Sequence, residues 1–132
     1  MTTPIRPAVI ARWHEIVETS DLRALDTLIA EDAVFSSPAV FTPQEGKAKT
    51  FAYLGAALTV FENTGFHYVD EWYGERSAVL EFAADLDGIH VNGVDMIRWS
   101  DEDRITSFKV MIRPLKGLQA LIPRMGEQLA QS

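Results

Sequence analysis

The sequence predicts an α+β domain in which N-terminal helices cover one face of a curved antiparallel sheet. Three observations predict it. Apolar residues recur at helical spacing over most of 7–61, apolar and polar residues alternate in runs from 66 onward, and helical spacing returns after Pro114. The chain has 132 residues, of which 47% are hydrophobic. This length and apolar content are enough for one hydrophobic core, so we expect one domain spanning 1–132.

Two helices are expected to form a hairpin at the start of the chain. Pro7 can open the first, which runs to residue 19. Ser20 is the expected N-cap of the second, which runs to about residue 29. The apolar residues expected on their buried sides are Val9, Ile10, Trp13, Ile16 and Val17 in the first, and Leu22, Leu25, Leu28 and Ile29 in the second.

A short strand is expected at 33–36, ended by Pro38. A third helix follows at 47–61, and the turn residues 63–65 stop it. Near the end of the chain, 115–130 predicts a last helix, which Pro123 is expected to kink.

The second half predicts four strands, at 66–73, 77–86, 89–99 and 104–112. Turn residues at 74–75, 87–88 and 101–103 separate them. Such short connections imply an antiparallel meander. Alternation places the apolar residues of each strand on one side; those of the second and last strands are Leu80, Phe82, Ala84, Leu86, Phe108, Val110 and Ile112.

One strand carries a carboxylate among apolar neighbours. Alternation puts Asp95, Ile97 and Trp99 on one face of the strand at 89–99. If that face lines a closed cavity, the loss of water raises the pKa of Asp95 and suits it to proton transfer or hydrogen-bond donation. If the face is open to water, Asp95 is a solvated strand residue. The strand alone leaves both alternatives open.

Composition excludes several classes of partner. The net charge of −7 argues against nucleic acid and anionic membranes, which call for a basic surface. Without cysteine there is neither a disulfide framework nor a thiol nucleophile. Residues 1–7 lack the apolar stretch of a signal peptide, and no apolar run reaches spanning length. The expected location is therefore the cytoplasm.

Other candidate chemistry finds little support. The three histidines have no metal-ligand spacing, so no metal and no cofactor is expected. Of these, His67 is expected at a surface or strand edge rather than as a catalytic base. Turn formation explains the acidic residues at 85–87 and 101–103 better than catalysis. Ser37 lacks the glycines of a nucleophile elbow.

The order of these elements resembles the nuclear transport factor 2-like superfamily, in particular its SnoaL-type members. The carriers of the resemblance are the break at 20–22, the stretch 30–35 followed by Ser37-Pro38, Gly46 before the third helix, and the meander that holds 94–99. The resemblance implies a cone-shaped curved sheet around helices, with an internal apolar pocket. It also implies frequent dimerisation through the outer sheet face.

This resemblance also suggests roles for single residues. By this resemblance, Asp95 falls where ketosteroid isomerases keep a protonated aspartic acid, a carboxylic acid that its apolar surroundings hold neutral. Trp13 falls at the position of their oxyanion-hole tyrosine, and Ser37 at that of the aspartate that moves the proton. Because serine without a partner base does not take up a proton near neutral pH, steroid isomerisation by that mechanism is not expected.

Two functions of different classes are therefore consistent with the sequence. The first is an isomerase, cyclase or lyase acting on an apolar cyclic or polyketide-like molecule, with Asp95 as acid, base or oxyanion donor. The second is a non-catalytic domain that binds a small ligand or a protein. In either case a homodimer is expected through the outer sheet face. The residues expected to line the pocket beside Asp95 are Trp13, Phe35, Ser37, Leu54, Leu80, Phe82, Trp99, Phe108 and Val110.

Overall fold

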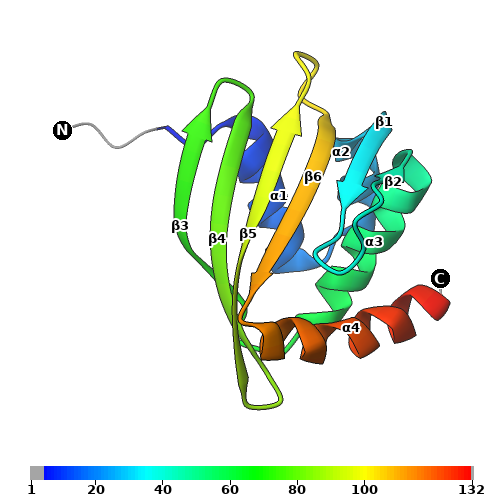
Figure 1. Ribbon diagram of the computed structural model, residues 1–132. Coiled ribbons are helices and arrows are strands. Elements are labelled where there is room, and N and C mark those ends of the chain that lie inside the picture. The colour runs from blue at the N-terminus through cyan, green and yellow to red at the C-terminus, as the bar shows by residue number, and fades with distance from the viewer. Residues whose placement is uncertain (1–4, 132) are drawn as a thin grey trace.

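The computed structural model describes residues 5–131, which form helices packed against one curved sheet (Figure 1). The helices are α1 (Ala8–Thr19), α2 (Leu22–Leu28), α3 (Lys47–Val60) and α4 (Leu115–Ala130). The strands are β1 (Ile29–Ser36), β2 (Gln44–Glu45), β3 (His67–Gly74), β4 (Ser77–Leu86), β5 (Ile89–Trp99) and β6 (Ile105–Arg113). The four strands expected in the second half match within one residue.

The sheet has six strands in the order β2-β1-β6-β5-β4-β3. Strands β3 to β6 form the expected antiparallel meander. The sheet as a whole is mixed, however, because β1 pairs with β6 in parallel, with Phe35 opposite Phe108. The physical reason is that α3 carries the chain from β1 to the far edge, and the meander then returns β6 beside β1.

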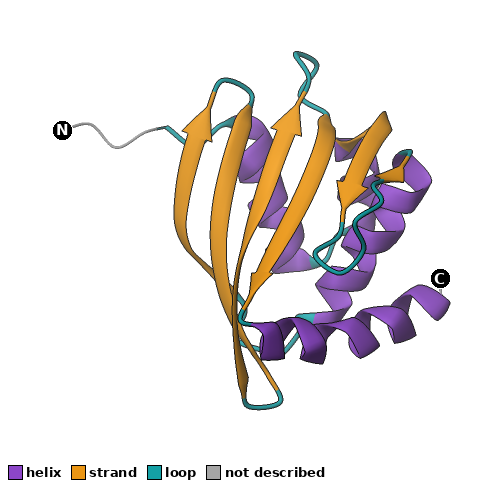
Figure 2. Ribbon diagram, in the orientation of Figure 1, coloured by secondary structure: helices purple, strands orange, loops and turns teal. Residues whose placement is uncertain are grey.

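The helices lie on one side of the sheet and leave its other face uncovered (Figure 2). Helix α1 packs inside the curve of the sheet, and α4 crosses the end where β5 meets β6, in contact with both strands and with α3. Pro123, which was expected to kink the last helix, lies inside α4, and the helix continues through it from Leu115 to Ala130. This arrangement is the helix-covered, curved sheet that the sequence predicts.

The helical hairpin differs from expectation at its turn. Asp21, rather than Ser20, caps α2, because its carboxylate accepts hydrogen bonds from the backbone N–H groups of Arg23 and Ala24, each at 3.1 Å. Ser20 instead ends α1 in a left-handed conformation. Leu22 is 48% exposed and not buried, whereas Ile29 is buried as the first residue of β1. The first strand therefore begins four residues earlier than predicted.

No helix within residues 5–131 combines the length and apolar character needed to cross a membrane. Residues 1–4, which belong to the segment expected not to be a signal peptide, lie outside the described part of the chain.

The core contains two clusters of buried apolar side chains. The larger joins α1 and α2 to the middle of the sheet and includes Trp13 and Phe108. The smaller joins α4 to the end of the sheet that this helix crosses, and it includes Phe82 of β4 and Leu121 of α4. Gly93 is needed here, since a Cβ at this position would lie 2.6 Å from the Phe82 ring and 2.5 Å from the carbonyl oxygen of Met111.

Replacing Phe82 by alanine should lower the free energy of unfolding by about 3 kcal/mol or more, because a fully buried aromatic ring is lost and a cavity remains. Urea unfolding monitored by circular dichroism measures this loss. Phe41→Ala is the control, since the Phe41 ring is fully exposed and its removal should change stability little. A loss below about 1 kcal/mol for Phe82→Ala would contradict its place in the core.

Candidate active site

A cavity of about 440 Å³ lies between the sheet and the helices. Side chains of α1, α3, α4 and the sheet line it, and so does the loop that follows β1. It includes eight of the residues that the sequence predicted for a pocket: Trp13, Phe35, Ser37, Leu54, Phe82, Asp95, Phe108 and Val110. Most of its wall is apolar, so a bound molecule would contact mainly hydrocarbon.

Two of the predicted pocket residues do not line this cavity. Leu80 is opposite Asp95 in the β4–β5 register and is wholly buried in the larger core cluster. Trp99 lies at the end of β5, beyond an irregularity in the register between Arg98 and Trp99. Both side chains point to the helical side of the sheet, but neighbouring side chains cover them. Strand alternation predicted the correct face of the sheet without predicting how far along it the cavity extends.

Asp95 is held in the middle of the sheet. Its backbone lies between Leu80 of β4 and Val110 of β6, and the residue is 6% exposed. The hydroxyl group of Tyr68, on β3, donates a hydrogen bond of 2.6 Å to Oδ2 of Asp95. No residue within 5–131 donates to Oδ1. Since Asp95 lines the cavity, that oxygen is the one left for a bound molecule.

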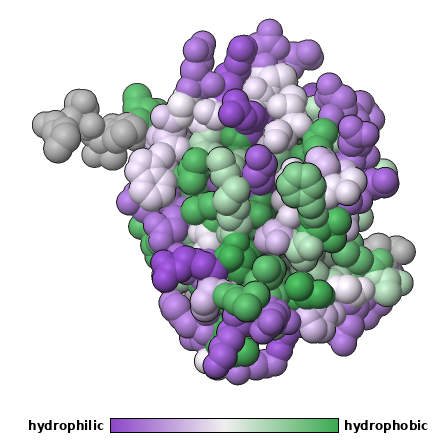
Figure 3. Space-filling view, in the orientation of Figure 1, coloured by the Kyte–Doolittle hydropathy of each residue, from purple (hydrophilic) through white to green (hydrophobic). Residues whose placement is uncertain are grey.

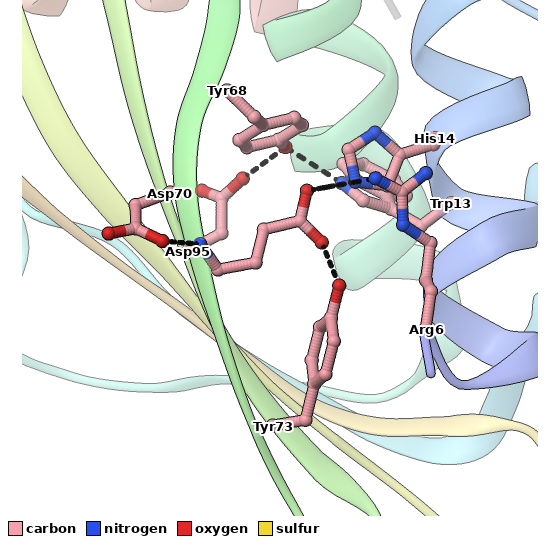
Figure 4. A network of polar contacts seen from close by, with 8 residues as sticks. Arg6, Trp13, His14, Tyr68, Asp70, Tyr73 and Asp95 are labelled. Carbon is pink, nitrogen blue, oxygen red and sulfur yellow. Dashed lines mark hydrogen bonds and ion pairs between the residues drawn. The ribbon is translucent and has the colours of Figure 1, made fainter. Parts of the chain in front are cut away.

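Trp13 gives this hydrogen bond a fixed direction. Its indole Nε1 donates to the Tyr68 hydroxyl oxygen at 2.8 Å, and an indole N–H is only ever a donor. The hydroxyl proton of Tyr68 is therefore left to point to Asp95. Figure 4 shows this chain, with Trp13 on the helix, Asp95 on the sheet and Tyr68 between them. The Trp13 ring also packs edge-on against Phe108, with ring centres 5.0 Å apart.

Burial changes the proton affinity of both acidic groups. The pKa of Asp95 rises from an ordinary value of 3.8 to about 7, because burial disfavours the charged carboxylate, while the hydrogen bond from Tyr68 partly offsets the rise. The pKa of Tyr68 is raised well above its ordinary value, first by burial and then by the charge of Asp95. Tyr68 therefore remains a protonated donor wherever Asp95 titrates.

This arrangement leaves Asp95 as the group that can exchange a proton with a bound molecule. Near neutral pH its carboxyl group is divided between two forms. The protonated form can donate from Oδ1 to a carbonyl oxygen, and the ionised form can accept a proton from a neighbouring carbon. Tyr68 does not exchange a proton with a bound molecule in this way, because its hydroxyl hydrogen is donated in the hydrogen bond to Oδ2 of Asp95.

The wall of the cavity offers few other polar groups. Ser37 lines it, and its Oγ accepts a hydrogen bond of 3.1 Å from the backbone N–H of Ala39. The acidic residues among the described lining residues are Asp95 and Glu62, and Glu62 is exposed. Within residues 5–131 the cavity thus holds one buried carboxyl group and no second buried base.

The histidines lie away from the cavity wall. His67 is exposed, and its Nδ1 lies 2.8 Å from the carbonyl oxygen of Gly65. In the described part of the chain, no three His, Asp or Glu side chains gather in a way that could hold a metal ion.

Sequence reasoning missed Tyr68 as a member of the site. The strand at 66–73 was predicted, but its two faces could not be assigned, and the structure has a register shift between Tyr68 and Asp70. Because a bulge reverses the alternation, Tyr68 and Glu71 both face inward although they are three residues apart. A buried tyrosine needs a hydrogen-bond partner, and that requirement was the available signal.

Comparisons with known proteins agree with this structure. The family profile described as a SnoaL-like domain matches residues 10–108, and the chain belongs to this family. A steroid delta-isomerase of Pseudomonas aeruginosa is 40% identical, with a TM-score of 0.89 over 98% of this chain and 97% of that one. No match was found among curated proteins.

Two further solved structures are similar to this one. An uncharacterised protein of Silicibacter pomeroyi with a cystatin-like fold is 30% identical, with a TM-score of 0.83 over 92% of this chain and 84% of that one. SalBIII, an epoxide hydrolase/cyclase-like enzyme of pyran ring formation in salinomycin, is 21% identical, with a TM-score of 0.65 over 81% and 89%. The latter likeness shows a shared fold alone. The family match and the likeness to the Pseudomonas aeruginosa protein support the predicted nuclear transport factor 2-like cone.

Asp95→Asn should remove one pH dependence of stability. Because the pKa of Asp95 is higher in the folded state, its stabilising contribution is complete below about pH 3.8 and is lost as the pH rises to about 7, a total on the order of 4 kcal/mol. Asparagine keeps the shape and does not ionise. The variant should therefore gain stability relative to the parent across this range, as measured by urea unfolding at several pH values.

Asp85→Asn is the matched control, since Asp85 is an exposed carboxylate on β4. It should show no such gain. A stability difference between Asp95→Asn and the parent that stays constant from pH 4 to pH 8 would contradict a desolvated Asp95.

Proposed function

We propose that this protein is an enzyme of the isomerase, cyclase or lyase type, acting on a small apolar cyclic or polyketide-like molecule that carries a carbonyl group. Asp95 is its acid/base or oxyanion donor. The single observation that carries this proposal is the buried carboxyl group, which lines an apolar cavity with one oxygen bound to Tyr68 and the other without a partner among residues 5–131. The activity named for the 40% identical Pseudomonas aeruginosa protein supports the same reaction class.

The chemistry follows from the two forms of Asp95. In one role, the ionised carboxylate takes a proton from a carbon beside the carbonyl group and returns it to another carbon of the same molecule. A pKa of about 7 suits both halves of that transfer at neutral pH. In the other role, the protonated acid donates to the carbonyl oxygen and stabilises the negative charge that develops there. The apolar wall orients the molecule in either case.

Asp95→Asn should abolish turnover while binding survives, because asparagine keeps the shape and loses the transferable proton. A β,γ-unsaturated apolar ketone such as 5-androstene-3,17-dione is a suitable first probe, since its conjugation is followed by ultraviolet absorbance. Binding is measured by quenching of the fluorescence of Trp13 and the other tryptophans. Unchanged turnover in Asp95→Asn, for any substrate found, would refute the catalytic role of Asp95.

The pH profile separates the two roles of Asp95. If the ionised form acts, kcat/KM rises with pH through about 7; if the protonated form acts, it falls through the same value. A profile without a transition in this region would contradict both roles.

A specific observation favours the second function, a binding domain without catalysis. The described cavity wall contains no second buried base, and the resemblance to ketosteroid isomerases implies that Ser37 takes the position of their proton-moving aspartate. A pocket of this kind can hold an apolar ligand through Asp95 alone. Ligand binding by both the parent and Asp95→Asn, without product formation from a panel of ketones, is the result that would favour this function.

We also propose that the outer face of the sheet forms a symmetric homodimer. Apolar residues gather over the middle of this face in Figure 3. Met111 of β6 and Trp72 of the edge strand β3 also lie on this face, each 52% exposed. On either side, β3 and β4 carry Asp70, Glu81 and Asp85, whereas β5 and β6 carry Arg98, Lys109 and Arg113. A twofold axis that lies between the two sheets and runs parallel to the strands brings each acidic flank to a basic flank.

Light scattering at micromolar concentration should therefore give the mass of a dimer. Trp72→Asp should shift the protein to monomer, because it replaces a large apolar side chain of the interface by a charge. Phe41→Asp is the control, since Phe41 is equally apolar and fully exposed but lies outside the sheet. A monomeric parent protein would contradict this assembly. The cytoplasm remains the location expected from the sequence.

A further inference from the structure

A second polar cluster lies next to the Trp13–Tyr68–Asp95 chain and shares Tyr68 with it (Figure 4). His14 follows Trp13 on α1, and its ring packs edge-on against the Tyr68 ring, with centres 5.0 Å apart and planes at 71°. Two consecutive residues of one helix therefore hold the same tyrosine. Trp13 binds its hydroxyl oxygen, and His14 contacts its ring.

Glu71 of β3 holds His14 in turn. Oε2 of Glu71 lies 2.7 Å from Nε2 of His14, an ion pair when the imidazole is protonated, and the two side chains are 12% and 15% exposed. The contact is one of charge and proximity, because its angles are not those of a hydrogen bond. The hydroxyl group of Tyr73 donates to Oε1 of Glu71 at 2.7 Å, and Arg6 lies 3.4 Å from Oε2. Asp70 accepts a hydrogen bond from the backbone N–H of Glu71 at 2.8 Å. Both carboxylate oxygens of Glu71 thus have partners.

The position of this cluster explains how it could act on the cavity without lining it. Glu71, Leu80 and Asp95 form one inward-facing row across β3, β4 and β5. Neither Glu71 nor His14 is among the residues of the cavity wall, whereas Tyr68 is. The link between the cluster and Asp95 therefore passes through Tyr68.

We propose that His14, held by Glu71, is a positioning residue that fixes the Tyr68 ring so that its hydroxyl group lies between Trp13 and Asp95. This inference rests on the proposed role of Asp95 and adds a residue that acts on it from outside the cavity. The Tyr68 hydroxyl group has to be held in position, because its hydrogen bond of 2.6 Å to Asp95 weakens steeply when donor and acceptor are misaligned. The Tyr68 ring also lies edge-on to Phe66 and Phe82, with ring centres 5.2 Å and 6.4 Å apart, so His14 completes a set of aromatic contacts around it.

The negative charge of Glu71 also helps to keep Tyr68 protonated and therefore a hydrogen-bond donor. The carboxylate of Glu71 contributes to the raised pKa of Tyr68 and so opposes loss of the phenolic proton. Because the hydrogen bond from Tyr68 lowers the pKa of Asp95 against the effect of burial, anything that loosens Tyr68 should raise the pKa of Asp95. A residue that only supports the fold would leave that value unchanged.

A double-mutant cycle on the full chain tests the proposal. The carboxyl carbon of Asp95 is titrated by NMR in the parent, Tyr68→Phe, His14→Ala and the double variant. Tyr68→Phe should raise the pKa of Asp95 by about one pH unit, the usual effect of one hydrogen bond to a charged group. His14→Ala should raise it by a smaller amount. In the Tyr68→Phe background, His14→Ala should have no further effect.

Two comparisons complete the experiment. Glu71→Gln should also raise the pKa of Asp95, whereas simple removal of a nearby negative charge would lower it. Glu81→Gln is its matched control, since Glu81 lies on the outer face of the sheet and should have no effect. Glu15→Ala, an exposed neighbour of His14 on α1, is the control for a change in the helix.

The proposal is overturned if His14→Ala leaves the pKa of Asp95 unchanged, if its effect persists in the Tyr68→Phe background, or if Glu71→Gln lowers the value. His14→Phe covers the case in which His14→Ala does not fold, because it keeps an aromatic ring and loses the pairing with Glu71; it too should raise the pKa of Asp95, and an unchanged value overturns the proposal. None of these measurements needs turnover, so their failure is distinct from failure of the proposed catalysis.

Discussion

The hydrogen bond from Tyr68 to Asp95 is the interaction on which the rest of the site depends. A carboxyl group that loses nearly all of its water needs a compensating partner, or its charged form becomes very costly. Tyr68 provides that partner for one oxygen only. The result is a group whose proton affinity lies between that of a solvated carboxylate and that of a wholly isolated acid, which is the range useful for chemistry at neutral pH.

The surrounding structure makes this hydrogen bond possible. Asp95 is on a central strand, whereas Tyr68 comes from an edge strand and reaches it across β4. Trp13 arrives from the helical layer and fixes the direction of the phenolic proton. Three elements distant in the sequence therefore meet at one hydroxyl group. The apolar wall around them is the condition that makes each of these polar contacts strong.

Two residues of the cavity wall limit its proton chemistry. The indole of Trp13 can donate a hydrogen bond to Tyr68 but cannot exchange a proton. Ser37 is not an acid, and within residues 5–131 the cavity wall holds no second buried carboxylate. Proton chemistry in this chain is thereby concentrated in Asp95. This is a physical difference from a site with two carboxyl groups, and it applies to the catalytic and the binding function alike.

The sequence by itself determined the order of the helices, the four-stranded meander and the face on which Asp95 lies, because these follow from local periodicity and turn residues. Six of the eight apolar residues that it indicated for the pocket line the cavity, but it did not indicate the contribution of α4. Only the tertiary structure decided that β1 runs parallel to β6, that Leu80 and Trp99 are covered, and that Tyr68 is the partner of Asp95. The reason is that strand pairing, a bulge that reverses alternation and the meeting of β3, β5 and α1 all depend on contacts between residues far apart in the chain, which no local pattern encodes.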